Sequence, residues 1–312
     1  MQEKFSKLLD SPECLNGTFK TGENGVRAIK TTSDGKIGFV DYGGKTLCYI
    51  DGSCGQRAIY PLAEVSFPKK VGYVVMDLDG TSIVSEEFWI EIIRLTTSEV
   101  LGKEVFFSEE DIPFVSGNTT MEHLHYALAK YGDPAQAYAN AMEVYHKVSR
   151  TELEKALVGD TDKIRPTAGL KEFLLELKKR GIKIGLVSSG LFYKAIPEIE
   201  SAFAQMGLGD PKTFYDSVIM GGVEKGTGKY GSLGEHVAKP HPWLYKELVV
   251  SGLNCMTNEN VLVIEDSASG VISGRLAGYA VVGLTTGNIA ASGLAELCTA
   301  QADNLSDILK LI

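Results

Sequence analysis

The amino-acid sequence predicts an α/β fold, in which a parallel β-sheet carries helices on both faces. Short apolar runs that end in polar residues alternate with amphipathic helical segments, which is typical of such sheets. Residues 85–159 contain helical patterns alone, which predicts an inserted helical domain. Residues 1–68 contain short alternating runs, which predict a small β-rich extension in front of the sheet.

The composition supports a globular protein with a sizeable core. The chain has 312 residues, of which 44% are hydrophobic and 23% charged. Its formal net charge is −9, so we expect no nucleic-acid partner, since binding to a phosphate backbone requires a basic surface. The five cysteines form no CxxC pair, and no segment reads as a signal peptide or a membrane helix. We therefore expect a cytoplasmic protein that contacts no membrane.

The first predicted element is the extension, residues 1–68. Its apolar runs, at 37–40, 46–50 and 57–60, are separated by Asp-Gly and Gly-Gly pairs. Such pairs favour the tight turns of antiparallel hairpins, so we expect a small meander. Residues 68–70 would form the junction to the sheet. The sequence assigns neither a function nor a protein partner to this extension.

The strands of the main sheet are predicted at 71–76, 182–187, 217–220 and 261–264. Each is nearly continuous in apolar residues, as strands buried on both faces are. The clearest helix, 169–180, directly precedes the second of these strands and has Gly181 just past its end. In parallel sheets ligands bind at the carboxyl ends of the strands, so the polar residues after these runs would share one edge.

The inserted domain is predicted from the stretch 85–159. Helical spacing is present at 85–101 and 120–131, and Asp133-Pro134 is a suitable start for a third helix that runs to Leu157. This stretch is far longer than an ordinary crossover between two strands. We therefore expect a sheet domain formed by residues 69–84 and 160–312, interrupted by a helical domain at 85–159.

Two acidic residues directly follow the first buried strand. Asp77 and Asp79 precede Gly80, which allows the backbone to turn sharply. Two neighbouring carboxylates repel each other, and a bound cation is the natural way to keep both ionised. The same pattern also occurs in ordinary surface turns, but its position at the end of a buried strand favours a site.

A second acidic pair, Glu265 and Asp266, ends the last apolar run. In a parallel sheet both pairs would reach the same edge. Carboxylates without histidine or cysteine form a hard oxygen site, which suits Mg²⁺ better than zinc. The pair is also placed to cap the helix that begins near Ser267, and this role is compatible with metal binding.

Two further motifs are weak when taken alone. Ser188, Ser189 and Gly190 follow the second strand, where hydroxyls and backbone N–H groups at the start of a helix could bind an anion. The same three residues are also ordinary loop composition. Lys239 precedes Pro240 in a stiffened segment, although a single lysine is usually a solvated surface residue.

The four motifs occur in an order that resembles the haloacid dehalogenase (HAD) superfamily. Asp-x-Asp-Gly-Thr comes first, then the serine, then Lys-Pro, and then Glu-Asp. The resemblance covers about residues 71–290 and implies a Rossmann-like core. The inserted helices resemble the cap of the β-phosphoglucomutase-like branch, whereas the extension lies outside the resemblance.

The resemblance implies a role for each matching residue. Asp77 would be the nucleophile that forms an aspartyl-phosphate, and Asp79 the general acid and base. Mg²⁺ would be held by Asp77, by the Asp79 carbonyl and by Asp266, with Glu265 adjacent or acting through a water molecule. An acid at position 79 favours phosphate esters over the dehalogenation reaction, in which no leaving alkoxide needs a proton.

The resemblance also implies how the phosphoryl group is held and selected. Ser188 would bind it with help from Ser189 and Gly190, and Lys239 would neutralise the charge shared with Asp77. The cap would close over the site and exclude water. Its specificity loop would contain four residues: Ser116, Gly117, Asn118 and Thr119. For His123 and His125, the simpler interpretation is that they are polar positions of an amphipathic helix.

The sequence therefore predicts a Mg²⁺-dependent phosphatase, a phosphoric monoester hydrolase, that acts on a small phosphorylated metabolite, with sugar phosphates among the candidates. One alternative is a phosphomutase of the β-phosphoglucomutase kind, which would use the same residues. The other is a regulatory or binding protein built on this scaffold, with residues 1–68 as its interaction module. Because every catalytic position is filled, the sequence favours an enzyme.

Overall fold

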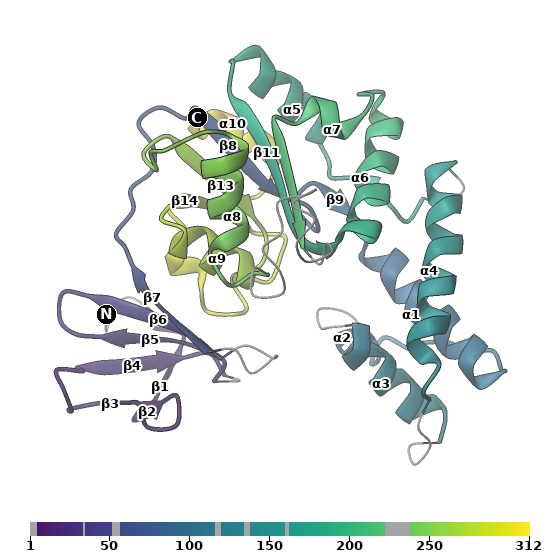
Figure 1. The fold of residues 1–312 in the computed structure, drawn as a ribbon, viewed down its shortest axis with the longest axis horizontal. Helices are drawn as coiled ribbons and strands as arrows, with labels where there is room; N and C mark the ends of the chain where they lie inside the picture. Colours follow the sequence, from purple (N-terminus) through teal and green to yellow (C-terminus); the bar gives the residue numbers. More distant parts are fainter. Residues whose placement is uncertain are drawn as a thin grey trace. The chain divides into compact units, whose positions relative to one another are not determined.

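The structure is a computed structural model that describes residues 5–33, 35–51, 57–115, 120–133, 138–159, 162–221 and 238–312. The chain divides into two compact units. The sheet unit contains Met1–Ser82, Thr167–Ala195 and Asp210–Ile312, and the helical unit contains Ile83–Pro166 and Ile196–Gly209. Figure 1 shows their elements, coloured from purple at the N-terminus to yellow at the C-terminus.

The sheet unit is built on a six-stranded parallel sheet in the order β12-β11-β8-β13-β14-β15. Of the strands in this sheet, β8 comes first in the sequence and lies in the middle, with β11 and β12 on one side and β13 to β15 on the other. The direction of winding therefore reverses at β8, and in open α/β sheets such a reversal marks the binding crevice. The strands are β8 (Tyr73–Asp77), β11 (Lys183–Leu191), β12 (Ser217–Gly221), β13 (Val261–Glu265), β14 (Ala280–Leu284) and β15 (Ala300–Ala302).

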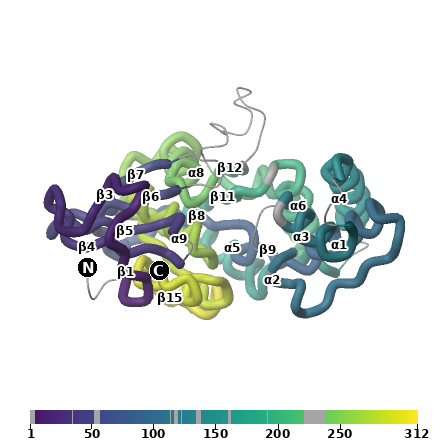
Figure 2. Tube along the Cα trace, turned by 90° about the horizontal axis from the view of Figure 1, so that it is seen from below, coloured from purple at the N-terminus to yellow at the C-terminus, as the bar shows by residue number. Residues whose placement is uncertain are grey.

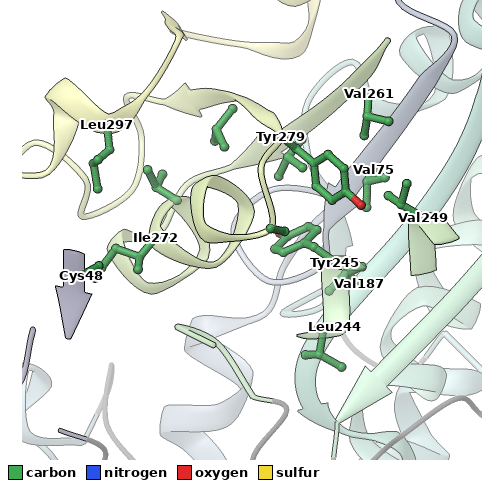
Figure 3. Packing of buried hydrophobic residues seen from close by; sticks show 14 of the residues in the cluster. Cys48, Val75, Val187, Leu244, Tyr245, Val249, Val261, Ile272, Tyr279 and Leu297 are labelled. Carbon is green, nitrogen blue, oxygen red and sulfur yellow. The ribbon is translucent and has the colours of Figure 1, made fainter. Parts of the chain in front are cut away.

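Helices pack against this sheet, which confirms the predicted α/β class. Helix α5 packs against β11 and α10, α8 packs against β11 and β12, and α9 packs against α8, β13 and β14. Figure 3 shows the apolar packing around α8 and α9, in which Val75 and Val187 of the sheet lie near Tyr245, and Ile272 of α9 lies on the side of Cys48. The helices of this unit are α5 (Leu170–Lys179), α7 (Pro211–Phe214), α8 (Trp243–Glu247) with a π-helical turn (Leu248–Gly252), α9 (Ala268–Leu276), a 3₁₀ turn (Ala295–Leu297) and α10 (Leu305–Leu311).

The extension forms an antiparallel five-stranded sheet in the order β1-β4-β5-β6-β7, as its turn pairs predict. Its strands are β1 (Leu9–Asp10), β4 (Ala28–Thr31), β5 (Ile37–Asp41), β6 (Thr46–Asp51) and β7 (Arg57–Leu62), and a hairpin of β2 (Glu13–Cys14) and β3 (Phe19–Lys20) lies between the first two.

The central strands of this small sheet, β4, β5 and β6, are buried on both faces. Val40 and Tyr49 belong to an apolar cluster within the extension. Phe39 and Cys48, one residue away in each strand and therefore on the opposite face, join the cluster that contains Ile272 of α9. Strand β7 also contacts α9, and its path can be followed in Figure 2. The extension is therefore packed onto the sheet unit and is counted in it.

The helical unit has an apolar core of its own, formed mainly by α1, α3 and α4. Two short strands, β9 and β10, pair antiparallel where the chain enters and leaves it. Helix α4 begins at Ala141, directly after a turn at residues 139–140. The predicted helix start at Asp133-Pro134 cannot be compared in full, since residues 134–137 lie outside the described residues. No helix in the described part of the chain is long and apolar enough to cross a membrane. The elements are β9 (Ile83–Val84), α1 (Glu86–Leu101), α2 (Ile112–Val115), α3 (Thr120–Tyr131), α4 (Ala141–Leu157), β10 (Arg165–Pro166) and α6 (Phe192–Met206), of which α6 starts in the sheet unit.

Candidate active site

The register of the parallel strands brings three of the predicted motifs to one level of the sheet edge. Asp77 ends β8 and pairs with Val187 of β11, so Ser188 is the next residue along. On the other side Met76 pairs with Ile264 of β13, which places Glu265 level with Asp77. The predicted meeting of these side chains at the carboxyl ends of the strands is therefore present in the structure.

Lys239 joins two of the acidic residues across this edge. Its Nζ donates a hydrogen bond to Asp77 Oδ1 and a second, 2.6 Å long, to Glu265 Oε1. The lysine side chain is only 5% exposed. Burial by itself lowers the pKa of Lys239, but the carboxylates of Asp77 and Glu265 outweigh it and hold the pKa above its usual value. The ammonium group therefore stays charged between the two acids.

Three carboxylates form a compact acidic cluster beside this lysine. One oxygen from each of Asp77, Glu265 and Asp266 lies within 4.8 Å of the others. Burial and the charge of Glu265 raise the pKa of Asp77 well above its usual value, and the same two causes raise the pKa of Asp266 to about 7. One lysine does not balance three carboxylates. A divalent cation with oxygen ligands fits this excess of negative charge.

The two oxygens of Glu265 are held by different groups. Oε1 accepts from Tyr245 at 2.5 Å as well as from Lys239, and Oε2 accepts from the Ser267 hydroxyl at 3.0 Å. Burial and the charge of Glu265 raise the pKa of Tyr245 well above its usual value, so its hydroxyl remains a donor. A Cβ on Gly270 would lie 1.8 Å from Glu265 Oε1, so only glycine leaves room for this carboxylate.

Asp79 lies in a different environment from Asp77. Asp77 is 5% exposed, whereas the side chain of Asp79 faces solvent. The Ser188 hydroxyl lies 3.4 Å from Asp79 Oδ2 and itself accepts a hydrogen bond from the backbone N–H of Gly190 at 2.9 Å. One acid of the motif is therefore buried against a lysine, and the other can exchange protons with water.

The tight turn after β8 places the backbone against Asp266. Gly80 has φ +79°, and a Cβ at this position would lie 2.1 Å from Asp266 Oδ2. The hydroxyl of the next residue, Thr81, lies 3.5 Å from Asp266 Oδ1, and the Ser82 hydroxyl donates to the carbonyl of Asp77 at 2.6 Å. Position 80 therefore requires glycine for two reasons: the positive φ, and the lack of room for a Cβ beside Asp266.

Sequence reasoning missed two side chains that support this site, Tyr245 and Ser267. No local pattern points to Tyr245, because its partner Glu265 comes from another strand. Ser267 also caps α9 by accepting from the N–H of Gly270 at 3.1 Å, and its place after the Glu-Asp pair could have indicated this. Ser189 had been assigned to phosphate binding, and in the structure its hydroxyl accepts from the backbone N–H of Lys239 at 3.0 Å.

The loop predicted to select the substrate cannot be compared with the structure. Ser116, Gly117, Asn118 and Thr119 lie outside the described residues. His123 and His125 lie on α3 of the helical unit, where His125 is exposed and His123 partly buried.

The comparisons with known proteins agree with the class that the fold and the acidic edge define. The model of the haloacid dehalogenase-like hydrolases matches residues 71–278, so the chain belongs to this family. The chain is an enzyme of the phosphatase class within it.

Among curated proteins, the chain is similar to pyrophosphatase PpaX of Listeria welshimeri, with 26% identity over 78% of this chain and 97% of that protein. PpaX of Listeria monocytogenes serotype 4a is 25% identical over the same shares.

Solved structures share the fold. A predicted phosphoglycolate phosphatase from Haemophilus somnus has a TM-score of 0.60 and 20% identity, over 77% of this chain and 97% of that one. A Thermotoga maritima protein proposed to be a β-phosphoglucomutase has a TM-score of 0.58 and 22% identity, over 78% of this chain and 100% of that one. The family model begins at residue 71, after the last strand of the extension.

Proposed function

We propose that this phosphatase is a Mg²⁺-dependent phosphomonoester hydrolase that acts on a small phosphorylated metabolite through an aspartyl-phosphate on Asp77. The observation that carries the proposal is the environment of Asp77. Its carboxylate is buried at the carboxyl edge of the sheet, bound by Lys239 and adjacent to Glu265 and Asp266. A carboxylate held in this way is oriented toward one edge and is suited to attack a phosphorus atom.

The first half of the reaction uses both acids of the motif. An oxygen of Asp77 forms a bond to phosphorus while the bond from phosphorus to the ester oxygen breaks. Asp79, exposed and 3.4 Å from Ser188, gives its proton to the departing alkoxide. The products of this step are the free alcohol and the phosphorylated Asp77.

In the second half, Asp79 acts as the base. It takes a proton from a water molecule as the water oxygen bonds to phosphorus, and the bond between phosphorus and Asp77 breaks. Inorganic phosphate leaves and Asp79 regains the proton with which the cycle began. Throughout, the Lys239 ammonium offsets negative charge on Asp77 and on the phosphoryl oxygens, and charge compensation of this kind is the main contribution of a protein to phosphoryl transfer.

The acidic cluster fits a magnesium ion. Asp77, Asp266 and the carbonyl of Asp79 would hold it, and Glu265, whose oxygens already accept from Lys239, Tyr245 and Ser267, would add negative charge beside it. When bound, Mg²⁺ supplies positive charge that favours the ionised form of Asp77 and offsets charge on the phosphoryl group. This compensation matters because the pKa of Asp77 is raised in its absence.

The proposal is tested by assaying phosphate release from a panel of phosphorylated metabolites with Mg²⁺. We expect Asp77→Asn to reduce release by more than about 1,000-fold, because the variant lacks the nucleophile. Asp162→Asn is the matched control, since Asp162 is exposed and lies in the other unit. It should retain the wild-type rate.

The same assay separates the phosphatase from a phosphomutase. Hydrolysis releases inorganic phosphate that disappears with EDTA, whereas a mutase converts a sugar phosphate into its isomer with little phosphate released. Isomer formation without phosphate release would contradict the proposal. So would an Asp77→Asn variant as active as Asp162→Asn.

A further inference from the structure

The segment that carries Lys239 is attached to the N-terminal extension. His241 follows Lys239 by two residues, and its Nδ1 forms a 2.8 Å hydrogen bond with the hydroxyl of Tyr60 in β7. The Tyr60 ring also packs edge-on against His241 and Trp243, with centroid distances of 5.8 and 6.4 Å. A tyrosine of the extension therefore contacts the residues on the C-terminal side of the lysine.

The same segment is held from two other directions. The backbone N–H of Lys239 donates to the Ser189 hydroxyl at 3.0 Å, and the carbonyl of His241 accepts from the Ser273 hydroxyl of α9 at 2.6 Å. Helix α9 is the helix that directly follows Glu265 and Asp266. The lysine segment is thus fixed between β11, α9 and the extension.

Strand β7 is held against α9, and these contacts fix the position of Tyr60. The buried guanidinium of Arg275 donates to the carbonyl of Ala63, just past β7, and to the carbonyl of Leu297, both at 2.9 Å. The apolar residues Cys48 and Ile50 of the neighbouring β6 share a cluster with Ile272 of α9. The position of Tyr60 is therefore set by the helix that starts at the acidic cluster.

We propose that Tyr60 is a positioning residue for Lys239, so that the N-terminal extension helps to hold the lysine of the phosphatase site in place. Lys239 reaches Asp77 and Glu265 through a flexible four-carbon side chain, and placement of its backbone narrows where the ammonium can lie. Small displacements of a charged group at a reaction centre have large effects on rate. This inference rests on the proposed function, since it concerns the lysine of that site.

The first test compares Tyr60→Phe with Tyr42→Phe. The Tyr60 variant keeps the ring that packs on His241 and loses only the hydroxyl, whereas Tyr42 packs in the separate cluster of the extension. We expect kcat of Tyr60→Phe to fall about fivefold, the factor expected for one lost hydrogen bond, with KM within about twofold of wild type. Tyr42→Phe should keep both constants.

A rescue series separates positioning from general packing. His241→Asn places an amide group near the position of Nδ1 and can still bond to Tyr60, whereas His241→Ala cannot. We expect His241→Asn to keep a kcat several-fold higher than that of His241→Ala. Equal kcat values for these two variants, or an unchanged kcat in Tyr60→Phe, would overturn the inference.

The second test does not depend on turnover. Hydrogen exchange is measured at the amides of Lys239 and His241, which donate to the Ser189 hydroxyl at 3.0 Å and to the carbonyl of Ala238 at 3.1 Å. We expect faster exchange at both amides in Tyr60→Phe than in wild type or Tyr42→Phe. Unchanged exchange would overturn the inference whatever the activity. Faster exchange in a chain that hydrolyses no phosphate ester would instead support the positioning role and contradict the proposed function.

Discussion

The two acids of the Asp77–Asp79 pair lie in different environments, and the difference fits the two roles that we propose for them. They are two residues apart, yet Asp77 is buried against Lys239 while Asp79 faces solvent. A nucleophile benefits from a fixed orientation and a neighbouring positive charge, whereas a general acid and base must exchange its proton with water. The assignment of roles that the family resemblance implies is therefore the one that burial favours.

The raised pKa of Asp266 predicts how the stability of the metal-free chain varies with pH. Because burial and Glu265 raise this pKa to about 7, the folded state binds a proton that the unfolded state releases near pH 4. This contribution to stability is complete below pH 4 and is lost as the pH rises to about 7. From 1.36 kcal/mol per pH unit, the loss is at most about 4 kcal/mol.

This dependence can be measured by thermal unfolding in EDTA between pH 4.5 and 8. We expect Asp266→Asn to be less sensitive to pH than wild type, and Mg²⁺ to raise the Tm of wild type more at pH 8 than at pH 5, because ligands must be ionised to bind metal. Asp162→Asn serves as the control and should follow wild type. A wild-type Tm that rises steadily over this range in EDTA would show that the cluster is ionised without a cation.

Gly80 provides a second prediction for a single residue. In Gly80→Ala the new Cβ would have to displace Asp266 Oδ2, 2.1 Å away, in addition to adopting φ +79°. Gly22→Ala is the matched control in the same unit, because its φ is +86° and no atom lies within 4 Å of its Cβ.

Both variants should lose about 1 to 2 kcal/mol of stability to backbone strain. Only Gly80→Ala should also weaken Mg²⁺ binding, measured by calorimetry, since only there does the side chain of a proposed ligand move. Equal Mg²⁺ affinities in the two variants would show that Asp266 does not depend on this turn.

The strands of the main sheet could be predicted from the sequence, whereas several side-chain contacts between distant elements could not. Runs such as 71–76 and 261–264 are apolar because both faces of each strand are covered, and this pattern is visible in one dimension. The contact of Tyr245 with Glu265 and that of Tyr60 with His241 depend on the packing of distant elements, which leaves no periodic pattern in the sequence. The start of α4 at Ala141 could not be predicted, because the Asn140 side chain before it makes no capping hydrogen bond.

In the helical unit, Asp111 connects α3 to the loop before α2. This fully buried carboxylate accepts hydrogen bonds from Lys130 and Tyr131 at 2.6 Å, from Tyr126 at 2.7 Å and from the backbone of Ser108 at 2.7 Å. Burial alone would raise the pKa of Asp111, but the hydrogen bonds, that of Lys130 foremost, hold the pKa well below its usual value.

We therefore expect Asp111→Asn to destabilise the chain by about 2 to 3 kcal/mol, because an amide nitrogen would face groups that donate. Urea unfolding measures this change, with the exposed Glu109→Gln as the control. The sign of the pKa shift implies that the contribution of Asp111 is present at neutral pH and is lost only as the pH falls below the usual range for aspartate. An Asp111→Asn chain as stable as Glu109→Gln at pH 7 would contradict this account.

For the whole molecule, the sequence indicated a β-rich extension but not its relation to the sheet unit. Short alternating runs show that a face is buried, and they do not show what covers it. In the structure both faces of the central strands are covered, since Val40 packs within the extension while Phe39 joins the cluster that contains Ile272 and Leu297 of the main fold. The family resemblance could not supply this contact, because the matching region begins at residue 71.

The shared cluster predicts that the extension is needed for the stability of the sheet unit. A chain of residues 63–312 would lose the apolar partners Phe5, Phe39 and Ile50, each fully buried and worth about 1.5 to 3 kcal/mol in transfer free energy. It would also expose the α9 surface that they cover. We expect this truncated chain to unfold at a markedly lower temperature or to aggregate.

A pair of point variants tests the same idea in the full chain. Phe39 is 0% exposed and stacks on Phe5 with the ring centroids 4.1 Å apart, whereas Leu9 in the same sheet is 55% exposed. We expect Phe39→Ala to lower the free energy of unfolding by about 3 to 5 kcal/mol, and Leu9→Ala by less than about 1 kcal/mol. If the cluster is continuous, unfolding of Phe39→Ala followed by tryptophan fluorescence should remain a single transition, because Trp243 lies beside Tyr60 of the extension. A separate early transition that leaves phosphatase activity intact would mean that the extension folds and unfolds apart from the site, and this result would also remove the basis for a role of Tyr60 in placing Lys239.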